Sequence, residues 1–267
     1  MEKSVVKHKI VLFYVFTFAI SWLSWFLMSR VYQGGDPTVL VYVFSTLGGL
    51  GPLLSLLILD RLSGKAISIG QNLSQIRIRG AGRIWFLPAI FILPVITILG
   101  NLGYFLAGRE PVFRLLKSGP DTLGWAVLPA ILIQFVTSLV TSPLFEEPGW
   151  RGFALGNLQA KFGREIGSLI VGVLWWTWHI PMNLTFGLQP SIYSALSMIL
   201  LSFLIDSLFN LSGRNLFTAM LAHAASGTVI IYLYQGNDNL LYLFLLLGIV
   251  ILLRVREAVP GRKNSSA

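Results

Sequence analysis

The chain has 267 residues, of which 55% are hydrophobic and only 12% are charged. A soluble domain carries about twice that charged fraction, so the composition excludes an ordinary soluble protein and favours a polytopic membrane protein. The sequence contains no cysteine, which excludes disulfides, thiolate metal sites and a cysteine nucleophile.

Apolar runs follow one another along the chain, and most reach the roughly 20 residues that a helix needs to cross a bilayer. Eight can be drawn, covering residues 10–29, 38–59, 84–107, 124–147, 166–186, 190–211, 215–234 and 239–253. We therefore expect an all-α polytopic membrane protein with about eight transmembrane helices, folded as a single membrane-embedded domain over residues 1–267. The first run is too long and too rich in tryptophan for a cleaved signal peptide.

The formal net charge is +9, and the basic residues gather in alternate connections between the apolar runs. Most of the 20 Lys and Arg residues lie before residue 10, in segments 61–83 and 151–164, at Arg214 and in segment 254–263. The other connections hold Arg30, Arg109, Arg114 and Lys117. Because Lys and Arg favour cytoplasmic segments, we expect both termini in the cytoplasm. The positive charge then points to anionic lipid as a partner, and not to nucleic acid.

Six ionisable side chains lie inside the apolar runs or, in the case of Arg151, just after one, where membrane packing does not explain them: Glu146, Glu147, Arg151, His179, Asp206 and His223. Such groups are costly in a membrane, so they usually pair with one another or serve a function. Glu147 and Arg151 are four residues apart, which predicts an ion pair on one helix face and leaves Glu146 free. Asp206 is expected to cap or pair locally, for instance with Asn210.

Pro148 and Gly149 follow the two glutamates directly, which predicts a kink in the helix at Pro148. If the helix continues past this kink to about residue 164, both glutamates lie within the membrane. They would then reach a depth similar to that of His179 and His223, which lie on two separate runs.

A carboxylate beside imidazoles can deprotonate a water and stabilise the oxyanion formed on a carbonyl, which is the pattern of peptide hydrolysis. One Glu and two His are also a recognised zinc ligand set, so zinc bound by Glu146, His179 and His223 is an alternative. The H-E-x-x-H motif of common zinc proteases is absent. A proton-coupled transporter that uses the same groups as a relay is a further alternative.

Three stretches, in this order, resemble the signatures of the CAAX prenyl protease and bacteriocin-processing (CPBP) family of membrane proteases, also called abortive-infection-like. The first, "EEPGWRGFALGNLQ", is similar to the E-E-x-x-x-R-G signature; the others are "WWTWHIP" and "NLFTAMLAHAASG". The resemblance covers about residues 120–235, which we take as the catalytic core.

The resemblance implies an intramembrane endopeptidase of the glutamate type, formerly called metallo-, that needs no cofactor. It implies that Glu146 activates the hydrolytic water with His179, and that His223 helps to hold the oxyanion. Glu147 and Arg151 would have supporting roles.

The chain departs from the family pattern at Gly227, where the family usually has Asn four residues after the histidine. A backbone N–H or Ser226 is expected to supply the missing donor. Loss of one oxyanion donor typically lowers the rate ~10²- to 10³-fold, so a non-catalytic membrane scaffold or bacteriocin-immunity protein is an alternative.

We expect the protein to be a multi-pass component of a prokaryotic cell membrane, because the sequence has no eukaryotic targeting signal. Its expected partners are the lipid bilayer and a peptide or membrane-protein substrate. Candidate substrates are prenylated C-terminal peptides, leader peptides and transmembrane anchors.

Overall fold

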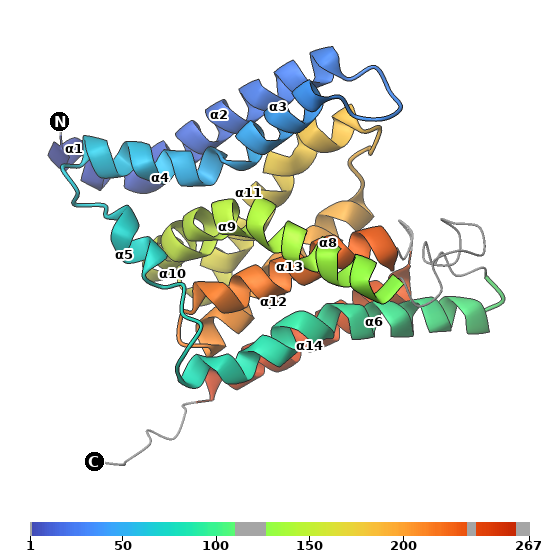
Figure 1. Cartoon of the computed structure of the whole chain (residues 1–267). Helices are drawn as coiled ribbons and strands as arrows, with labels where there is room; N and C mark the ends of the chain where they lie inside the picture. The colour runs from blue at the N-terminus through green and yellow to red at the C-terminus, as the bar shows by residue number, and fades with distance from the viewer. Residues whose placement is uncertain (1, 110–126, 234–238, 260–267) are drawn as a thin grey trace.

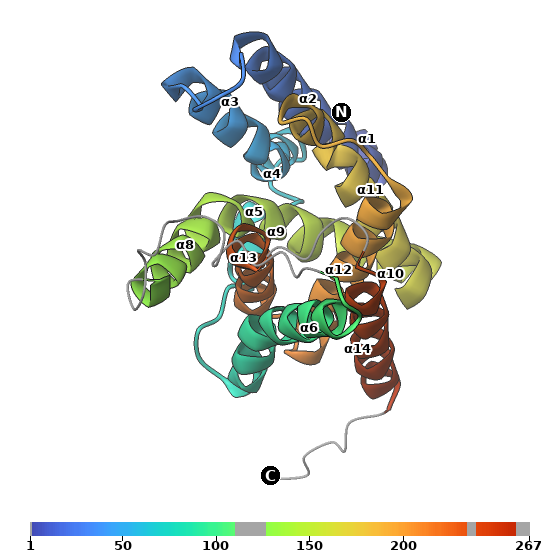
Figure 2. The same cartoon turned by 90° about the vertical axis from the view of Figure 1, so that its right-hand side faces the viewer.

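The computed structural model describes residues 2–109, 127–233 and 239–259, and these residues form helices and short connections without a β-strand. The all-α prediction is therefore confirmed for the described chain (Figures 1 and 2). Arg114 and Lys117, in the connection between the apolar runs 84–107 and 124–147, lie outside the described residues. The same holds for Arg262 and Lys263 near the C-terminus.

Each predicted apolar run coincides with one helix or with consecutive helices. The N-terminal part contains α1 (Glu2–Lys7), α2 (Lys9–Val31), α3 (Val39–Gly49), α4 (Gly51–Leu62), α5 (Ile69–Leu73), η1 (Ala81–Trp85) and α6 (Phe86–Leu106). The C-terminal part contains α8 (Val127–Thr141), α9 (Pro143–Glu147), η3 (Pro148–Leu155), α10 (Gly156–Phe162), α11 (Arg164–Thr185), α12 (Ile192–Leu211), α13 (Leu216–Tyr232) and α14 (Leu240–Ala258).

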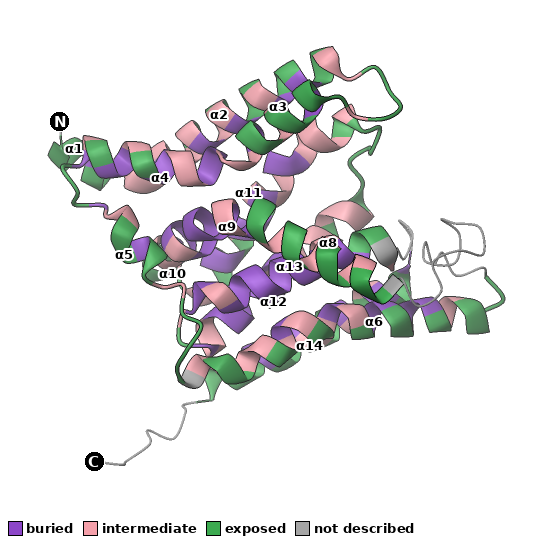
Figure 3. Ribbon diagram, in the orientation of Figure 1, coloured by how far each residue is buried: buried purple, intermediate pink, exposed green. Residues whose placement is uncertain are grey.

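Within the described residues, four helical stretches are long and apolar enough to cross a membrane: Lys9–Val31, Gly82–Leu106, Leu128–Phe162 and Ile192–Leu211. The pair α3 and α4, bent by 49°, is a fifth if it counts as one span. Exposed residues cover the outward faces of α2, α6, α8 and α14 (Figure 3). They include large apolar side chains such as Leu23, Phe91, Ile133 and Phe244, as a lipid-facing surface requires. The total of eight spans stays a prediction.

The described ends of the chain lie at the same end of the molecule, because α1 and the last turn of α14 are on one side in Figure 1. The basic segment 61–83, which includes α5 and η1, lies at that end as well. The predicted gathering of positive charge at one end of the bundle agrees with this arrangement. That this end faces the cytoplasm stays a prediction.

The segment from α9 through η3 to α10 lies in the middle of the fold, where α4, α11 and α13 contact its first two parts and α11 packs along α10. Helices α2, α3 and α4 lie on one side of it, and α6 and α14 lie on the other (Figure 2). The packing around this segment buries the indole rings of Trp150, Trp175 and Trp178 almost completely. The charged motif is therefore enclosed by helices from both halves of the chain.

The distortion predicted at Pro148 is present as a stretch of wide turns and not as a break. Residues Pro148–Leu155 form a π-helix that continues into α10, so the helix runs past the proline to Phe162 as expected. Wide turns are a common feature of functional sites in helices. The interruption lies before the glutamates, at Ser142, whose φ of −126° and ψ of −67° leave the helical region.

Candidate active site

Glu146 accepts two hydrogen bonds, whereas the sequence had suggested that it is free of partners. The Ser142 hydroxyl donates to Oε1 at 2.7 Å, and the Trp175 indole N–H donates to Oε2 at 3.1 Å. The residue is only 3% exposed. Because each carboxylate oxygen has two lone pairs, each keeps one for a further partner. Glu146 is thus a fixed carboxylate with remaining capacity to accept a proton.

Arg151 is fully buried and satisfied by three side chains. It donates to Glu147 Oε1 at 3.1 Å, to Asp206 Oδ1 at 3.0 Å and to Ser202 Oγ at 2.9 Å. Its guanidinium also lies 4.7 Å from the ring centre of Trp175. The predicted ion pair between Glu147 and Arg151 is therefore confirmed, and a second carboxylate completes it.

The prediction that Asp206 caps or pairs locally, for instance with Asn210, is wrong. Asp206 forms an ion pair with Arg151, whereas Asn210 donates to Glu257 of α14 at 3.2 Å. A buried guanidinium has five N–H groups that need acceptors, so it draws a second carboxylate from the neighbouring α12. Helix periodicity within α12 alone could not indicate this contact.

His223 connects the two glutamates through Ser142. Its Nδ1 lies 2.7 Å from Glu147 Oε1, and its Nε2 lies 3.4 Å from the Ser142 hydroxyl. An ionised carboxylate only accepts, so Nδ1 carries the proton in the neutral imidazole and Nε2 has the lone pair. A continuous chain of polar contacts therefore leaves α9 at Glu147, passes through His223 of α13 and returns through Ser142 to Glu146.

Among the described residues, one ring nitrogen of His179 has no hydrogen-bond partner, and the ring lies near Glu146. Its Nδ1 donates to the backbone carbonyl of Trp175 at 2.8 Å, which places the lone pair on Nε2. The ring packs edge-on against Trp175 and Trp178, at centroid distances of 5.3 Å and 4.7 Å. Both His179 and His223 lie close enough to Glu146 to interact with its charge.

Trp175 is the residue that the site groups share. Its indole N–H bonds Glu146, one ring face covers Arg151, and its ring contacts His223 edge-on at 5.1 Å. The sequence placed Trp175 in a motif but gave it no role, and it gave no role to Ser142. Both lie one helical turn before a predicted site residue, which was the only available signal.

The three proposed zinc ligands do not form a metal cage as they stand. Within the described ranges, no three His, Asp or Glu side chains are arranged to hold a metal ion. Both oxygens of Glu146 accept hydrogen bonds, and both nitrogens of His223 are in polar contact.

The residues of this site, from Ser142 to His223, lie inside a segment that matches a known family. Residues 127–229 match the family model described as "Type II CAAX prenyl endopeptidase Rce1-like". This segment is therefore similar to that family. A relative, the CAAX prenyl protease 2 of Methanococcus maripaludis, is 25% identical over 183 residues, or 64% of this chain. The chain spans 61% of the length of that relative.

The Ser138 side chain of the neighbouring helix α8 limits the space at Gly227. A Cβ atom there would lie 2.7 Å from the Ser138 hydroxyl of α8, closer than real contacts allow. The Ser226 hydroxyl donates to the backbone carbonyl of His223 at 2.7 Å. Ser226 is thus already bonded within α13, which argues against it as the replacement oxyanion donor.

Proposed function

We propose that the protein is an intramembrane endopeptidase that hydrolyses peptide bonds with a water activated by Glu146 and His179. The observation that carries this proposal is the setting of Glu146: a buried carboxylate, fixed by two donors, beside imidazoles from two other helices. The match of residues 127–229 to the Rce1-like family model supports the same reaction class.

In the proposed reaction, a water donates one hydrogen bond to Glu146 and one to Nε2 of His179. Glu146 takes a proton as the water oxygen attacks the carbonyl carbon, and a tetrahedral oxyanion forms. The protonated Glu146 then gives this proton to the departing amine nitrogen as the C–N bond breaks. The second water proton stays on the new carboxyl group and then passes to the amine, so the products are a carboxylate and an ammonium group, and atoms and charges balance.

His223 would hold the oxyanion in its protonated form, because only an imidazolium can donate from Nε2 while Nδ1 bonds Glu147. Glu147 would act as its counter-ion at 2.7 Å. A fixed donor aimed at the developing charge typically contributes ~10²- to 10³-fold in rate. Glu147 and Arg151 therefore support the reaction by orienting His223.

A serine mechanism is the second candidate, because Glu147, His223 and Ser142 stand in the order of an acid, a base and a nucleophile. Their separations are 2.7 Å and 3.4 Å. However, the single hydroxyl hydrogen of Ser142 has a nearer acceptor in Glu146, at 2.7 Å. Labelling of Ser142 by a fluorophosphonate would favour this mechanism over the glutamate one.

The substrate would be a peptide that reaches the site from the cytoplasmic leaflet of a prokaryotic cell membrane. The relative's name makes prenylated C-terminal peptides the first probe. Leader peptides and transmembrane anchors are the other candidates. A scaffold without catalysis and a proton-coupled transporter remain the competing functions for the same architecture.

The test is cleavage of a quenched peptide library, with and without prenyl groups, by the full chain in detergent. Glu146→Gln removes the base with almost no change in shape, and Glu165→Gln, at an exposed carboxylate on α11, is the matched control. We expect cleavage by the wild type and the control only, and no effect of a strong chelator. Cleavage that survives Glu146→Gln would overturn the proposal. Proton flux in liposomes without any cleavage would favour the transporter.

A further inference from the structure

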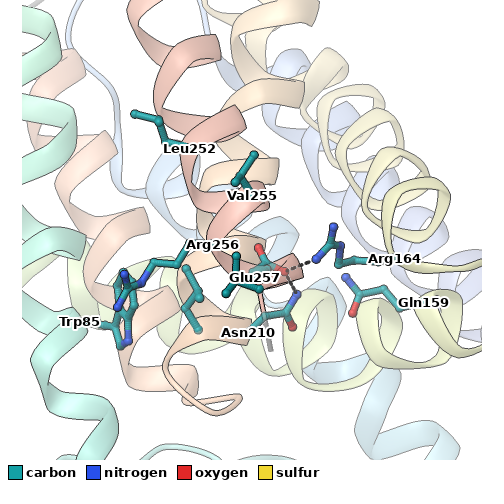
Figure 4. Close-up of a pocket in the computed structure, with 10 residues that line it drawn as sticks. Trp85, Gln159, Arg164, Asn210, Leu252, Val255, Arg256 and Glu257 are labelled. Atoms are coloured by element: carbon teal, nitrogen blue, oxygen red, sulfur yellow. Dashed lines mark hydrogen bonds and ion pairs between the residues drawn. The ribbon is translucent and has the colours of Figure 1, made fainter. Parts of the chain in front are cut away.

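A cavity of about 1030 Å³ opens at the basic end of the bundle, and Figure 4 shows the side chains that line it. It lies where the ends of α10, α12 and α14 meet η1 and the start of α11. None of the residues that line it belongs to the site around Glu146. The proposed hydrolysis leaves this cavity unexplained.

The wall that α14 contributes changes from apolar to cationic toward the end of the helix. Leu252 and Val255 line the cavity and are 65% and 58% exposed, as lipid-facing side chains would be. Arg256 follows at the basic end, one turn after Leu252. Trp85 stands opposite, with its ring 5.4 Å from the Arg256 guanidinium. Tryptophan at this level is typical of the membrane–water interface.

The charge that the cavity offers to a ligand is positive. Arg256 is exposed and forms no ion pair with a carboxylate of the described chain. Its guanidinium group lies over the ring of Trp85. Arg164, whose side chain is 36% exposed, uses Nε for Glu165 at 2.7 Å and approaches Glu257 only to 3.9 Å. It therefore keeps N–H groups that can serve another anion.

Glu257 is the acidic residue in the wall, and neighbouring groups balance its charge. Its side chain is 5% exposed, and Oε2 accepts from Asn210 at 3.2 Å and from Arg254 at 3.4 Å. Figure 4 shows Glu257 directed toward Arg164 and Asn210, with Arg256 on the other side of the cavity beside Trp85. The cavity therefore offers one guanidinium group on each side of Glu257.

We propose that this cavity binds the phosphate group of an anionic membrane lipid between Arg256 and Arg164, with an acyl chain along Leu252 and Val255. Arginine suits this task because its planar fork matches phosphate oxygens and is easily desolvated. The order of the wall, apolar and then cationic, is the order of a phospholipid from chain to headgroup. A bound lipid would connect the last turn of α14 to the start of α11, which carries Trp175 and His179.

The test measures the melting temperature of the full chain in detergent as phosphatidylglycerol is added. Phosphatidylcholine with the same chains is the control for headgroup charge, and inorganic phosphate is the control for a soluble source. Arg256→Gln removes the fork, and Arg79→Gln removes the same charge from an exposed arginine of segment 61–83. A ligand that binds only the folded state raises its melting temperature.

We expect phosphatidylglycerol to raise the melting temperature of the wild type and of Arg79→Gln, with little effect of phosphatidylcholine. For Arg256→Gln, the lipid concentration that gives half of the melting-temperature shift should be at least about tenfold higher than for the wild type, as expected for a lost charged hydrogen bond. If inorganic phosphate gives the same Arg256-dependent shift, the phosphate site stands and its ligand comes from solution. If both lipids act alike, or if Arg256→Gln responds as the wild type does, the proposal is wrong.

Discussion

Replacing Arg151 with methionine tests whether the buried charges in the middle of the fold depend on one cation. Methionine keeps the length and apolar volume of the arginine stem, so packing changes little. The change leaves Asp206 without its cation and Glu147 with His223 as its remaining partner. Because Arg151, Glu147 and Asp206 are all 0% exposed, water cannot replace the lost contacts without rearrangement of the core.

Removal of one partner from a buried ion pair typically lowers the free energy of unfolding by about 3–5 kcal/mol. For a chain of this size, 1 kcal/mol corresponds to roughly 2–4 °C in melting temperature. We therefore expect Arg151→Met to unfold about 6–20 °C below the wild type. Arg79→Met, at an exposed position, should change the free energy of unfolding by less than about 0.5 kcal/mol.

A double-mutant cycle with Asp206→Asn identifies the cause of this loss. Asparagine removes the unpaired charge, so the double variant should be more stable than the sum of the single effects, by about 0.5–3 kcal/mol. Thermal unfolding in one detergent, followed by tryptophan fluorescence, measures all four proteins. A melting temperature within 2 °C of the wild type for Arg151→Met, or strict additivity in the cycle, would refute the reasoning.

Three further substitutions test the contacts around the site. Ser142→Ala removes a donor from Glu146 and should lower kcat about tenfold or more, since a hydrogen bond to a charged group contributes about 1.5–3 kcal/mol. Ser142→Thr keeps the hydroxyl and should retain more activity. Equal kcat values for these two variants would contradict the hydrogen bond. Trp175→Phe keeps a ring but loses the indole N–H, so kcat in the peptide assay should fall while KM changes little; a change confined to KM would argue for a role in substrate binding instead. Gly227→Ala should lower the free energy of unfolding by about 1–3 kcal/mol through the contact with Ser138, and Ser138→Ala in the same chain should restore part of it; melting curves without such rescue would show that the two helices are not packed as described.

The periodic features of the sequence predicted the fold class and the positions of the helices. Runs of apolar residues need no long-range information, because a helix satisfies its own backbone in lipid. The i,i+4 spacing of Glu147 and Arg151 predicted their ion pair for the same reason. Continuation of the helix beyond Pro148 also followed from local geometry together with the depth of the two histidines.

Contacts between helices were less accessible from the sequence. The bond from Trp175 to Glu146, the bond from Glu147 to His223 and the pairing of Asp206 with Arg151 all join residues from different helices. Each depends on how two helices are rotated about their axes, and apolar runs that face lipid on many sides do not define that rotation. The interruption at Ser142, which directs its hydroxyl to Glu146, does have a local signal, because the residue before a proline, here Pro143, avoids the helical region.

Because Arg151 and His223 share one Glu147 oxygen, the stability of the fold and the proposed reaction depend on the same carboxylate. In many proteins a buried ion pair can be exchanged for apolar side chains at no loss, or even with a gain in stability. Here the same exchange would release the imidazole from its counter-ion. A descendant of this chain that did not need the proposed reaction would be free to make that exchange. Intact charges at these positions would then mark the lineages in which the proposed reaction is under selection.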